Sequence, residues 1–365
     1  MPSSHSIAAR LTRLRALLSK ERVDAFVLFV DEGGNKNVRY LSGFSGTSAA
    51  LIITRERAYI ATDARYTERA RSEAGHCELM QANANRKFSD IIAEISKAAR
   101  ASISRIGYEG ERVSVLMAER LAARVKKKWI PLDDIVGKLR QIKDAGEIAA
   151  LRRACRSTSR AFADVAPRIR AGTREIDVAR EIDMALRRRG AIENSFSTIV
   201  ASGPNAAIPH HNTNERRLRP GETVVLDFGG RYADGYCSDL TRTIFVPGKK
   251  PDPELRRAYD IVLAANRAAA RALRPGMSWK EYDGIARSYI AERGYGKNFT
   301  HALGHSVGLE AHDPCDYRAA IRARTVLTDE PGIYLEGRGG VRIEDDLVVT
   351  SSGAERLTNA PYIRR

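Results

Sequence analysis

The chain has 365 residues, of which 43% are hydrophobic and 29% are charged, a composition typical of a soluble globular protein with room for two domains. Its formal net charge is +16, but the Lys and Arg residues are scattered along predicted helix faces without a nucleic-acid-binding motif, so we expect no nucleic-acid partner. No hydrophobic run approaches the length of a transmembrane helix, and residues 1–20 show an amphipathic pattern instead of a signal peptide, so we expect no membrane partner.

The first part of the chain alternates strand and helix patterns. Short runs of strand-forming residues predict strands over residues 24–30, 49–54, 58–62 and 104–110. Apolar residues at helical spacing predict helices over residues 7–22, 66–75, 87–99 and 113–127. This alternation predicts an α/β domain with a mixed sheet. The segment 43–48 lacks the spacing and the lysine of a phosphate-binding loop, so we expect no nucleotide site there.

A long helical pattern that begins near Lys143 marks the start of a second domain. We place the boundary so that the first domain covers residues 1–138 and the second covers residues 139–365. Strands of the second domain are candidates for antiparallel pairing, because the segment LDFGGRYADGYCSD carries an Ala-Asp-Gly turn between two strand patterns. Asp227 and Asp239 would then face one another across a hairpin.

An internal repeat organises the second domain. Residues 169–190 align with residues 273–294 without a gap. Gly172 matches Gly276 at an offset of 104 residues (276 − 172), and the glycines that end the two segments keep the same offset. The repeat predicts two copies of one helix–helix–strand–strand unit, related by a pseudo-twofold axis.

Four acidic residues and one histidine fall in or beside apolar, strand-forming runs of this domain: Asp227, Asp239, His305, Glu330 and Glu344. The repeat offset brings each aspartate to within one residue of a glutamate, so two packed units would gather all four carboxylates at the pseudo-twofold axis. Buried negative charge must be protonated, paired or neutralised by metal. One imidazole among four carboxylates suits a pair of divalent first-row cations. The alternative is that these are unrelated turn and edge residues.

These residues stand in motifs that resemble the pita-bread metallopeptidases, the family of methionine aminopeptidase, aminopeptidase P and prolidase. The matching motifs are IVASGPNAAIPH, LDFGGRYADGYCSDLTRT, HALGHSVGLEAHD and EPGIYLEGRGGVRIEDD. In the first half, NVRYLSGFSGTSAALIIT and ATDARYTERA resemble the creatinase-type N-terminal domain of aminopeptidase P and prolidase, which methionine aminopeptidases lack. The resemblance implies an α/β creatinase-like domain followed by an α+β pita-bread domain of two pseudo-symmetric repeats. Ser306 and Asp313 depart from the pattern, since Gly and Glu are commoner there.

The metal chemistry assigns roles to the acidic cluster. We expect five metal ligands, which are Asp227, Asp239, His305, Glu330 and Glu344. Two bound metals would hold a bridging water and lower its pKa, which creates hydroxide near neutral pH. Glu330, close to that nucleophile, is the candidate proton acceptor and therefore also a candidate catalytic residue.

Three further histidines and one arginine complete the predicted site. His312 resembles the family histidine that helps a metal to stabilise the oxyanion, a catalytic role. His210 resembles a histidine with catalytic and substrate-binding roles, and His301 resembles another that lines the substrate pocket. Arg342, two residues before Glu344, would share a strand face with that ligand and could pair with a ligand carboxylate beside the substrate. His211 is interpreted as a loop residue, because its neighbour fits the motif better.

The resemblance implies hydrolysis of an Xaa-Pro bond by a dinuclear, metal-dependent exopeptidase through a metal-bridging hydroxide. We favour aminopeptidase P activity on a peptide with proline at its second position, and prolidase activity on dipeptides is the alternative. A creatinase-like hydrolase or a non-catalytic binding module fits less well, because all five ligands are present. Mn²⁺ is the expected metal, although Co²⁺ and Zn²⁺ suit the same ligands. Four irregularly spaced cysteines predict reduced thiols in a cytoplasmic protein, which we expect to be a homodimer.

Overall fold

The computed structural model describes residues 4–99 and 102–363. The chain forms two compact units, Met1–Arg140 and Gln141–Arg365, which are called unit 1 and unit 2 here and are described separately. Within the described ranges, none of the helices combines the length and the hydrophobicity that crossing a membrane requires.

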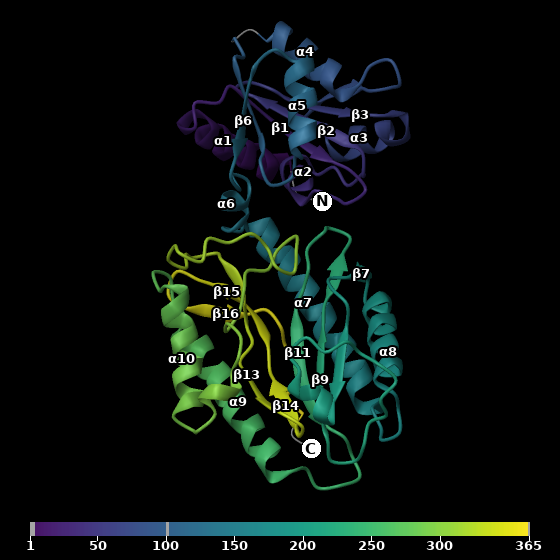
Figure 1. The fold of residues 1–365 in the computed structure, drawn as a ribbon, viewed down its shortest axis with the longest axis vertical. Helices are drawn as coiled ribbons and strands as arrows, with labels where there is room; N and C mark the ends of the chain where they lie inside the picture. The colour runs from purple at the N-terminus through teal and green to yellow at the C-terminus, as the bar shows by residue number, and fades with distance from the viewer. Residues whose placement is uncertain (1–3, 100–101, 364–365) are drawn as a thin grey trace. The chain divides into compact units, whose positions relative to one another are not determined.

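Unit 1 is built on a six-stranded sheet in the order β4-β3-β2-β1-β5-β6 (Figure 1). Its strands are β1 (Ala25–Val30), β2 (Ala49–Thr54), β3 (Ala58–Thr62), β4 (Glu78–Gln81), β5 (Arg105–Glu109) and β6 (Lys128–Leu132). The β1–β2 and β2–β3 pairs are antiparallel, whereas the remaining pairs are parallel. The predicted mixed α/β sheet is therefore confirmed.

In the described part of unit 1, six α-helices accompany this sheet: α1 (Ser4–Lys20), α2 (Lys36–Ser42), α3 (Thr67–Glu73), α4 (Phe88–Ala98), α5 (Val115–Arg124) and α6 (Gly137–Arg140). Every residue of β2 is buried, because helices pack over the sheet. Helix α4 is strongly amphipathic and contributes Ile91, Ile92 and Ile95 to the core cluster beside the sheet. Amphipathic helices and apolar central strands thus account for the core of unit 1.

Unit 2 contains two helix pairs and several short antiparallel sheets. The helices are α7 (Ala145–Val165), α8 (Glu175–Arg188), α9 (Pro253–Ala272) and α10 (Trp279–Ala291). The strands of the first half are β7 (Ala191–Asn194), β8 (Ile199–Ser202), β9 (Thr223–Phe228), β10 (Gly230–Tyr232) and β11 (Leu240–Phe245). Those of the second half are β12 (Val326–Asp329), β13 (Gly332–Leu335), β14 (Gly339–Arg342), β15 (Asp345–Val349) and β16 (Ala354–Arg356).

Each helix pair of unit 2 covers its own set of strands. Helices α7 and α8 share a core with β9 and β11, through residues such as Phe162, Ile182 and Phe228. Helices α9 and α10 share a second core with β12 and β15, through residues such as Val262 and Ile290. Figure 1 shows α8 and the α9–α10 pair on opposite sides of the strands.

The two halves of unit 2 repeat the same local structure. Helices α8 and α10 begin 104 residues apart (279 − 175). Gly172 and Gly276 both adopt a left-handed conformation, with φ of 85° and 95°. The amide of Gly172 donates to Leu218 O at 2.8 Å, and the amide of Gly276 donates to Ile321 O at the same distance. The predicted pseudo-symmetric repeat is confirmed, and its glycines are the residues that favour this backbone conformation.

Candidate metal centre and substrate pocket

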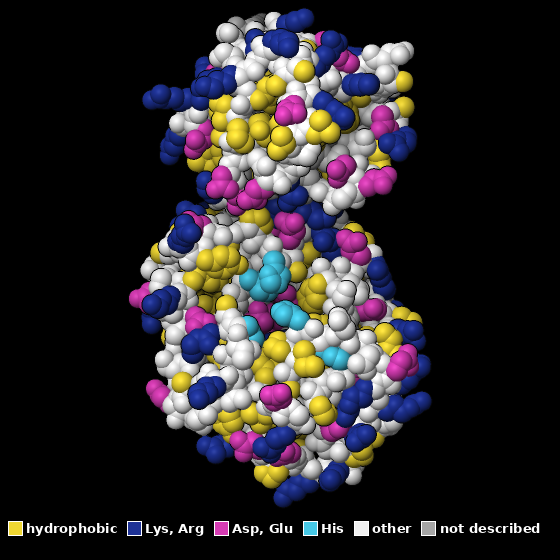
Figure 2. Space-filling model, in the orientation of Figure 1, with side chains coloured by type: hydrophobic (Ala, Val, Ile, Leu, Met, Phe, Trp, Pro, Cys, Tyr) yellow, Lys and Arg dark blue, Asp and Glu magenta, His cyan; other side chains and the backbone are white. Residues whose placement is uncertain are grey.

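A pocket of about 1200 Å³ in unit 2 brings together all the residues that the sequence predicts for the site. They are His210, Asp227, Asp239, His301, His305, His312, Glu330, Arg342 and Glu344. Figure 2 shows histidine side chains around a hollow in this unit, with acidic side chains visible inside it. The N-terminal halves of α8 and α10 supply part of the wall, so each repeat contributes an equivalent helix.

Strands β9 and β11 position the two aspartates. They pair in antiparallel register with Asp227 opposite Thr241, so Asp239 lies two residues earlier and just before β11 begins. The expected hairpin exists, but the aspartates lie diagonally instead of directly facing one another. Since residues two apart on a strand share a face, both carboxylates still reach the same side of the sheet.

The two glutamates come from the second repeat. The amide of Glu344 donates to Thr241 O at 3.0 Å, and its Oε2 accepts from Thr241 Oγ1 at 2.7 Å. The amide of Glu330 donates to Leu303 O at 2.8 Å, and its Oε1 accepts from Thr328 Oγ1 at 3.2 Å. A threonine hydroxyl therefore holds each carboxylate, and the threonine that holds Glu344 comes from the first repeat.

The imidazole of His305 lies among these carboxylates. Its Nε2 is 3.5 Å from Glu330 Oε1 and 3.8 Å from Asp239 Oδ2. Ligand atoms of Asp239, His305 and Glu344 all lie within 4.8 Å of one another, a spacing that could hold a metal ion. The amide of His305 donates to Thr328 Oγ1 at 2.9 Å, which ties the histidine segment to β12.

The electrostatics of this cluster fit divalent cations. Burial raises the pKa of Glu330 to about 8, and burial together with neighbouring carboxylates raises the pKa of Asp239 and Glu344 well above their ordinary values. Burial lowers the pKa of His305 to about 4, so its imidazole is neutral near pH 7, the form that binds metal. The carboxylates repel one another, and divalent ions would allow them to ionise together.

Arg342 links Asp227 to the histidine wall of the pocket. Its Nη2 donates to Asp227 Oδ2 at 2.6 Å, and its Nη1 donates to Tyr334 Oη at 3.0 Å and to Pro209 O at 3.2 Å. The same Tyr334 hydroxyl lies 2.8 Å from His301 Nε2. Burial lowers the pKa of His301 to about 4, so this ring is also neutral near pH 7.

His312 and His210 are the exposed histidines of the pocket. The ring of His312 stacks on that of His305, with centroids 3.7 Å apart and planes 15° from parallel. Burial and the nearby His210 lower the pKa of His312. His211, the neighbour of His210, is only 8% exposed and meets Glu175 Oε2 at 3.0 Å.

The two positions that depart from the family pattern meet in one buried contact. Lys143 Nζ donates to Asp313 Oδ2 and to Ser306 Oγ, both at 3.2 Å, and the side chains of this ion pair are 0% and 1% exposed. The amide of Asp313 also donates to Ser306 O at 2.8 Å, which closes the segment that carries both His305 and His312. The lysine therefore supports this segment from the start of unit 2.

Several residues of the site were missed by the sequence argument. Thr241 could have been found from its place two residues after Asp239, and Tyr334 from its place in the EPGIY motif. Lys143 and Glu175 gave no comparable signal, because their partners lie more than 25 residues away.

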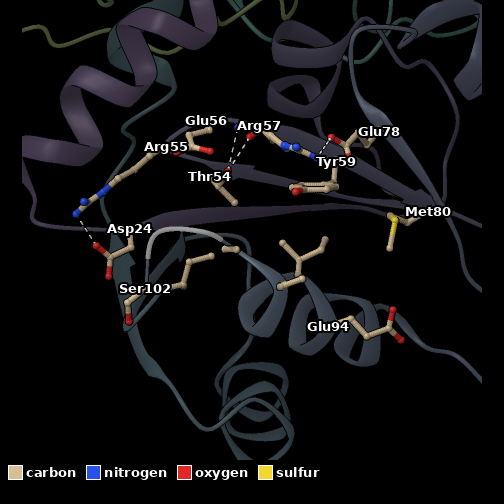
Figure 3. A pocket seen from close by; sticks show the side chains of 14 residues that line it. Asp24, Thr54, Arg55, Glu56, Arg57, Tyr59, Glu78, Met80, Glu94 and Ser102 are labelled. Carbon is tan, nitrogen blue, oxygen red and sulfur yellow. Dashed lines mark hydrogen bonds and ion pairs between the residues drawn. The ribbon is translucent and has the colours of Figure 1, made fainter.

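A second cavity of about 360 Å³ lies in unit 1 (Figure 3). Its charged walls are engaged in ion pairs, with Arg55 Nη2 at 2.7 Å from Asp24 Oδ1 and Arg57 Nη1 at 2.7 Å from Glu78 Oε1. None of the predicted site residues lines this cavity, whereas all of them line the pocket of unit 2.

A mixed α/β domain, followed by a domain of two repeats that share a buried carboxylate–histidine cluster, defines a two-domain metallohydrolase. The chain belongs to metallopeptidase family M24, whose model matches residues 149–351, and residues 10–142 match the creatinase/prolidase N-terminal domain. The predicted fold, with its creatinase-type and pita-bread domains, and the predicted metallopeptidase class are therefore confirmed.

The similarity to named relatives extends along nearly the whole chain. It is 36% identical over 353 residues to the Xaa-Pro dipeptidase of Pyrococcus furiosus, covering 93% of this chain and 98% of that protein. The structure of the Xaa-Pro dipeptidase from Bacillus anthracis superposes with a TM-score of 0.91, at 35% identity over 98% of both chains. That of the X-Pro aminopeptidase from Thermotoga maritima gives 0.86, at 34% identity over 97% of this chain and 98% of that one.

Proposed function

We propose that the protein is a metal-dependent Xaa-Pro dipeptidase, which releases proline from dipeptides that carry it as the second residue. The observation that most supports this proposal is the buried cluster of four carboxylates and His305 in the pocket. The chain that carries it is similar to Xaa-Pro dipeptidases over 93–98% of its length. This proposal reverses the preference for aminopeptidase P that the sequence suggested, because the named dipeptidases support the alternative better.

We propose that two divalent ions, preferably Mn²⁺, are held by the five predicted ligands: Asp227, Asp239, His305, Glu330 and Glu344. Co²⁺ and Zn²⁺ suit the same carboxylate and imidazole donors. Bound divalent ions polarise a scissile carbonyl and lower the pKa of a coordinated water. The hydroxyl of Thr241 orients Glu344, and that of Thr328 orients Glu330, so each glutamate would be held in place to bind the ions.

The remaining pocket residues act on the substrate. Glu330, beside His305 and facing the pocket, accepts the proton of the attacking water. His312 is exposed to the pocket and donates a hydrogen bond to the developing oxyanion. His210 contacts the substrate from the opposite loop, where it is exposed.

Proline suits this pocket because its amide nitrogen carries no hydrogen and its ring fixes φ. The wall formed by His301 and Tyr334 is rigid, since the imidazole and the phenol are 2.8 Å apart and Arg342 holds the same hydroxyl. A rigid wall accepts a ring of fixed shape, and the proline nitrogen needs no hydrogen-bond acceptor because it carries no hydrogen. We therefore propose that this wall and Arg342 bind the proline side of the scissile bond.

Aminopeptidase P activity is the second candidate. The pocket volume of about 1200 Å³ exceeds the needs of a dipeptide, and the similar structure from Thermotoga maritima bears the name X-Pro aminopeptidase. Both activities require the same carboxylate–histidine cluster. They differ in the substrate, which ends at the proline carboxylate in a dipeptide and continues beyond the proline in a longer peptide.

The test compares kcat/KM for Ala-Pro, Ala-Pro-Ala and Ala-Ala with the Mn²⁺-loaded protein. We expect Ala-Pro to be the best substrate, with Ala-Ala about 100-fold worse because one side chain decides the fit. Faster cleavage of Ala-Pro-Ala would favour aminopeptidase P. Equal values for Ala-Pro and Ala-Ala would reject proline specificity altogether.

We also propose that the protein works in the cytoplasm as a homodimer. Its four cysteines are free thiols, and three of them are buried, which supports a reducing compartment. Light scattering at several protein concentrations tests the dimer, and a monomeric mass at all of them would reject it.

A further inference from the structure

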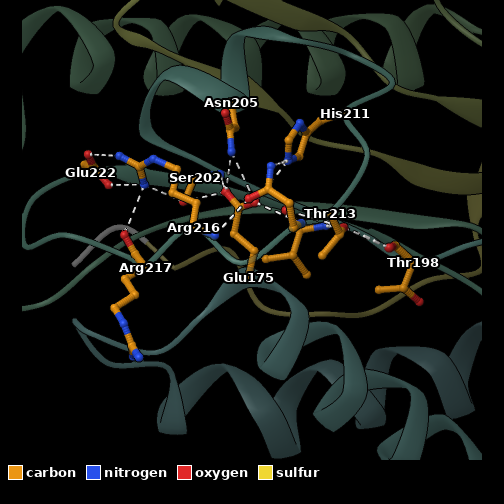
Figure 4. A network of polar contacts seen from close by, with 11 residues as sticks. Glu175, Thr198, Ser202, Asn205, His211, Thr213, Arg216, Arg217 and Glu222 are labelled. Atoms are coloured by element: carbon orange, nitrogen blue, oxygen red, sulfur yellow. Dashed lines mark hydrogen bonds and ion pairs between the residues drawn. The ribbon is translucent and has the colours of Figure 1, made fainter.

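Glu175, the first residue of α8, is a carboxylate with 0% exposure. It lies against side chains of residues 202–216 (Figure 4). These residues are called the His210 segment here, because they carry that histidine, which lines the pocket. A buried carboxylate is costly unless several donors satisfy its oxygens. The donors around Glu175 therefore show what this residue holds in place.

The His210 segment supplies most of these donors. Glu175 Oε1 accepts from the amide of Ser202 at 2.7 Å and from its hydroxyl at 2.6 Å. Asn205 Nδ2 donates to both carboxylate oxygens, at 3.0 and 3.2 Å. His211 Nε2 lies 3.0 Å from Oε2, and Figure 4 shows these side chains directed at the carboxylate. One side chain thus gathers three points along the segment.

Glu175 and the side chains bonded to its carboxylate are called the Glu175 hub here. Arg216, at the C-terminal end of the His210 segment, also contacts this hub. The amide of Glu175 donates to Arg216 O at 2.9 Å, and Arg216 Nη1 donates to Ser202 Oγ at 2.7 Å. Arg216 also pairs with Glu222 through contacts of 2.6 and 2.8 Å. The first and last residues of the His210 segment, Ser202 and Arg216, therefore contact each other, and both contact Glu175.

His210 is the direct chain neighbour of His211, whose ring makes one of these buried contacts with Glu175. His211 is 8% exposed, whereas His210 is exposed, and both line the pocket. On its other side, Pro209 O accepts from Arg342 Nη1 at 3.2 Å. His210 therefore stands between two anchors, one on Glu175 and one on the arginine that contacts Asp227.

The equivalent position in the second repeat is occupied by an aromatic residue instead of a carboxylate. The offset of 104 takes Glu175 to Trp279 (175 + 104), the first residue of α10. Trp279 contacts the ring of Tyr317, with centroids 4.9 Å apart, and both residues line the pocket. The start of α10 is thus packed by an aromatic contact, whereas the start of α8 is held by a hydrogen-bonded carboxylate. The Glu175 hub therefore has no counterpart at the equivalent position of the second repeat.

We infer that Glu175 is a positioning residue for substrate binding, which acts through His211 and Asn205 to hold His210 toward the substrate. The inference rests on the proposed function, since it takes His210 to contact the dipeptide. His211 then serves as the link between the buried hub and the pocket, which is more than the loop position that the sequence suggested.

The test is a double-mutant cycle on the Mn²⁺-loaded protein, with Glu175→Ala, His210→Ala and the double variant assayed on Ala-Pro. We expect Glu175→Ala to lower kcat/KM about 10–100-fold, mostly through KM, with the metal content unchanged. The double variant should be no worse than His210→Ala alone, within about a factor of two. Glu175→Gln keeps the acceptor for Ser202 and should recover part of the loss.

Glu222→Gln is the matched control, because its carboxylate pairs with Arg216 of the same segment and does not itself contact Glu175, Asn205 or His211. It should leave KM near the wild-type value. Histidine-selective NMR adds a readout that is independent of activity. The ring signals of His210 and His211 should move in Glu175→Ala and Glu175→Gln far more than in Glu222→Gln.

The outcomes separate the two claims. Additive losses in the cycle, or unmoved His210 ring signals in Glu175→Ala and Glu175→Gln, would overturn the role of Glu175. An inactive wild-type protein with moved ring signals would instead overturn the proposed function and leave the positioning role standing. If Glu175→Ala does not fold, the cycle is run with Glu175→Gln and the same criteria apply.

Discussion

Removal of the buried cation Lys143 should strongly destabilise unit 2. Its Nζ lies 3.2 Å from Asp313 Oδ2, and both side chains are fully shielded from solvent. At this distance and an effective dielectric constant of 20, the Coulomb attraction is about 5 kcal/mol. Breaking a buried pair by removing one partner costs about 3–5 kcal/mol, so Lys143→Met should lower Tm by roughly 6–20 °C for a domain of this size.

The assay is thermal and urea unfolding of the metal-free protein, so that changes in metal affinity do not contribute. Lys143→Met/Asp313→Asn removes both charges and should recover most of the loss. Arg338→Met breaks an exposed pair with Asp252 in the same unit and should leave the midpoint nearly unchanged. A loss below about 1 kcal/mol in the single variant, or an equal loss in the double variant, would refute the argument.

Three further predictions concern the pocket. Gly304→Ala should abolish metal binding and activity, because the added Cβ would lie 2.1 Å from Thr328 O and push the adjacent His305 off β12, whereas Gly284→Ala in α10 meets nothing within 4 Å and should retain both. His312→Ala should keep its metal by elemental analysis and lose about 10²–10³ in kcat, the usual effect of one oxyanion donor; loss of the metal would contradict this. The folded pKa of His301 is about 4, below the ordinary 6.5, so its contribution to stability is present above pH 6.5 and is lost as the pH falls toward 4. His301→Asn should therefore flatten the pH dependence of the free energy of unfolding in that window, and identical curves for the two proteins would contradict the assignment.

The sequence predicts best those elements whose own residues carry the signal. Strands β2 and β3 begin and end where the apolar runs of 49–54 and 58–62 predict, because polar and charged residues bound both runs. The edge strands β4 and β6 were missed, since β4 is short and half-exposed and β6 contains Pro131. Edge strands tolerate such residues, so their patterns are weak.

In the candidate site, too, residues with a local sequence signal could be predicted and residues without one could not. The five predicted ligands, which line one pocket, could be selected because each stands in a local motif, and the repeat offset related the carboxylates in pairs. The residues that hold them come from distant parts of the chain, as Thr241 does for Glu344 across 103 positions. Neither periodicity nor spacing reports such contacts. The diagonal placement of Asp227 and Asp239 also depends on strand register, which the Ala-Asp-Gly turn alone does not determine.

The most direct test of the proposed function is a Mn²⁺ titration of the chelated protein, with Ala-Pro hydrolysis and bound metal measured on the same samples. We expect no hydrolysis without metal, and activity that rises with occupancy until two ions are bound per chain. Asp239→Asn should bind less metal and remain inactive throughout. Full activity at zero metal content, verified by elemental analysis, would contradict the account.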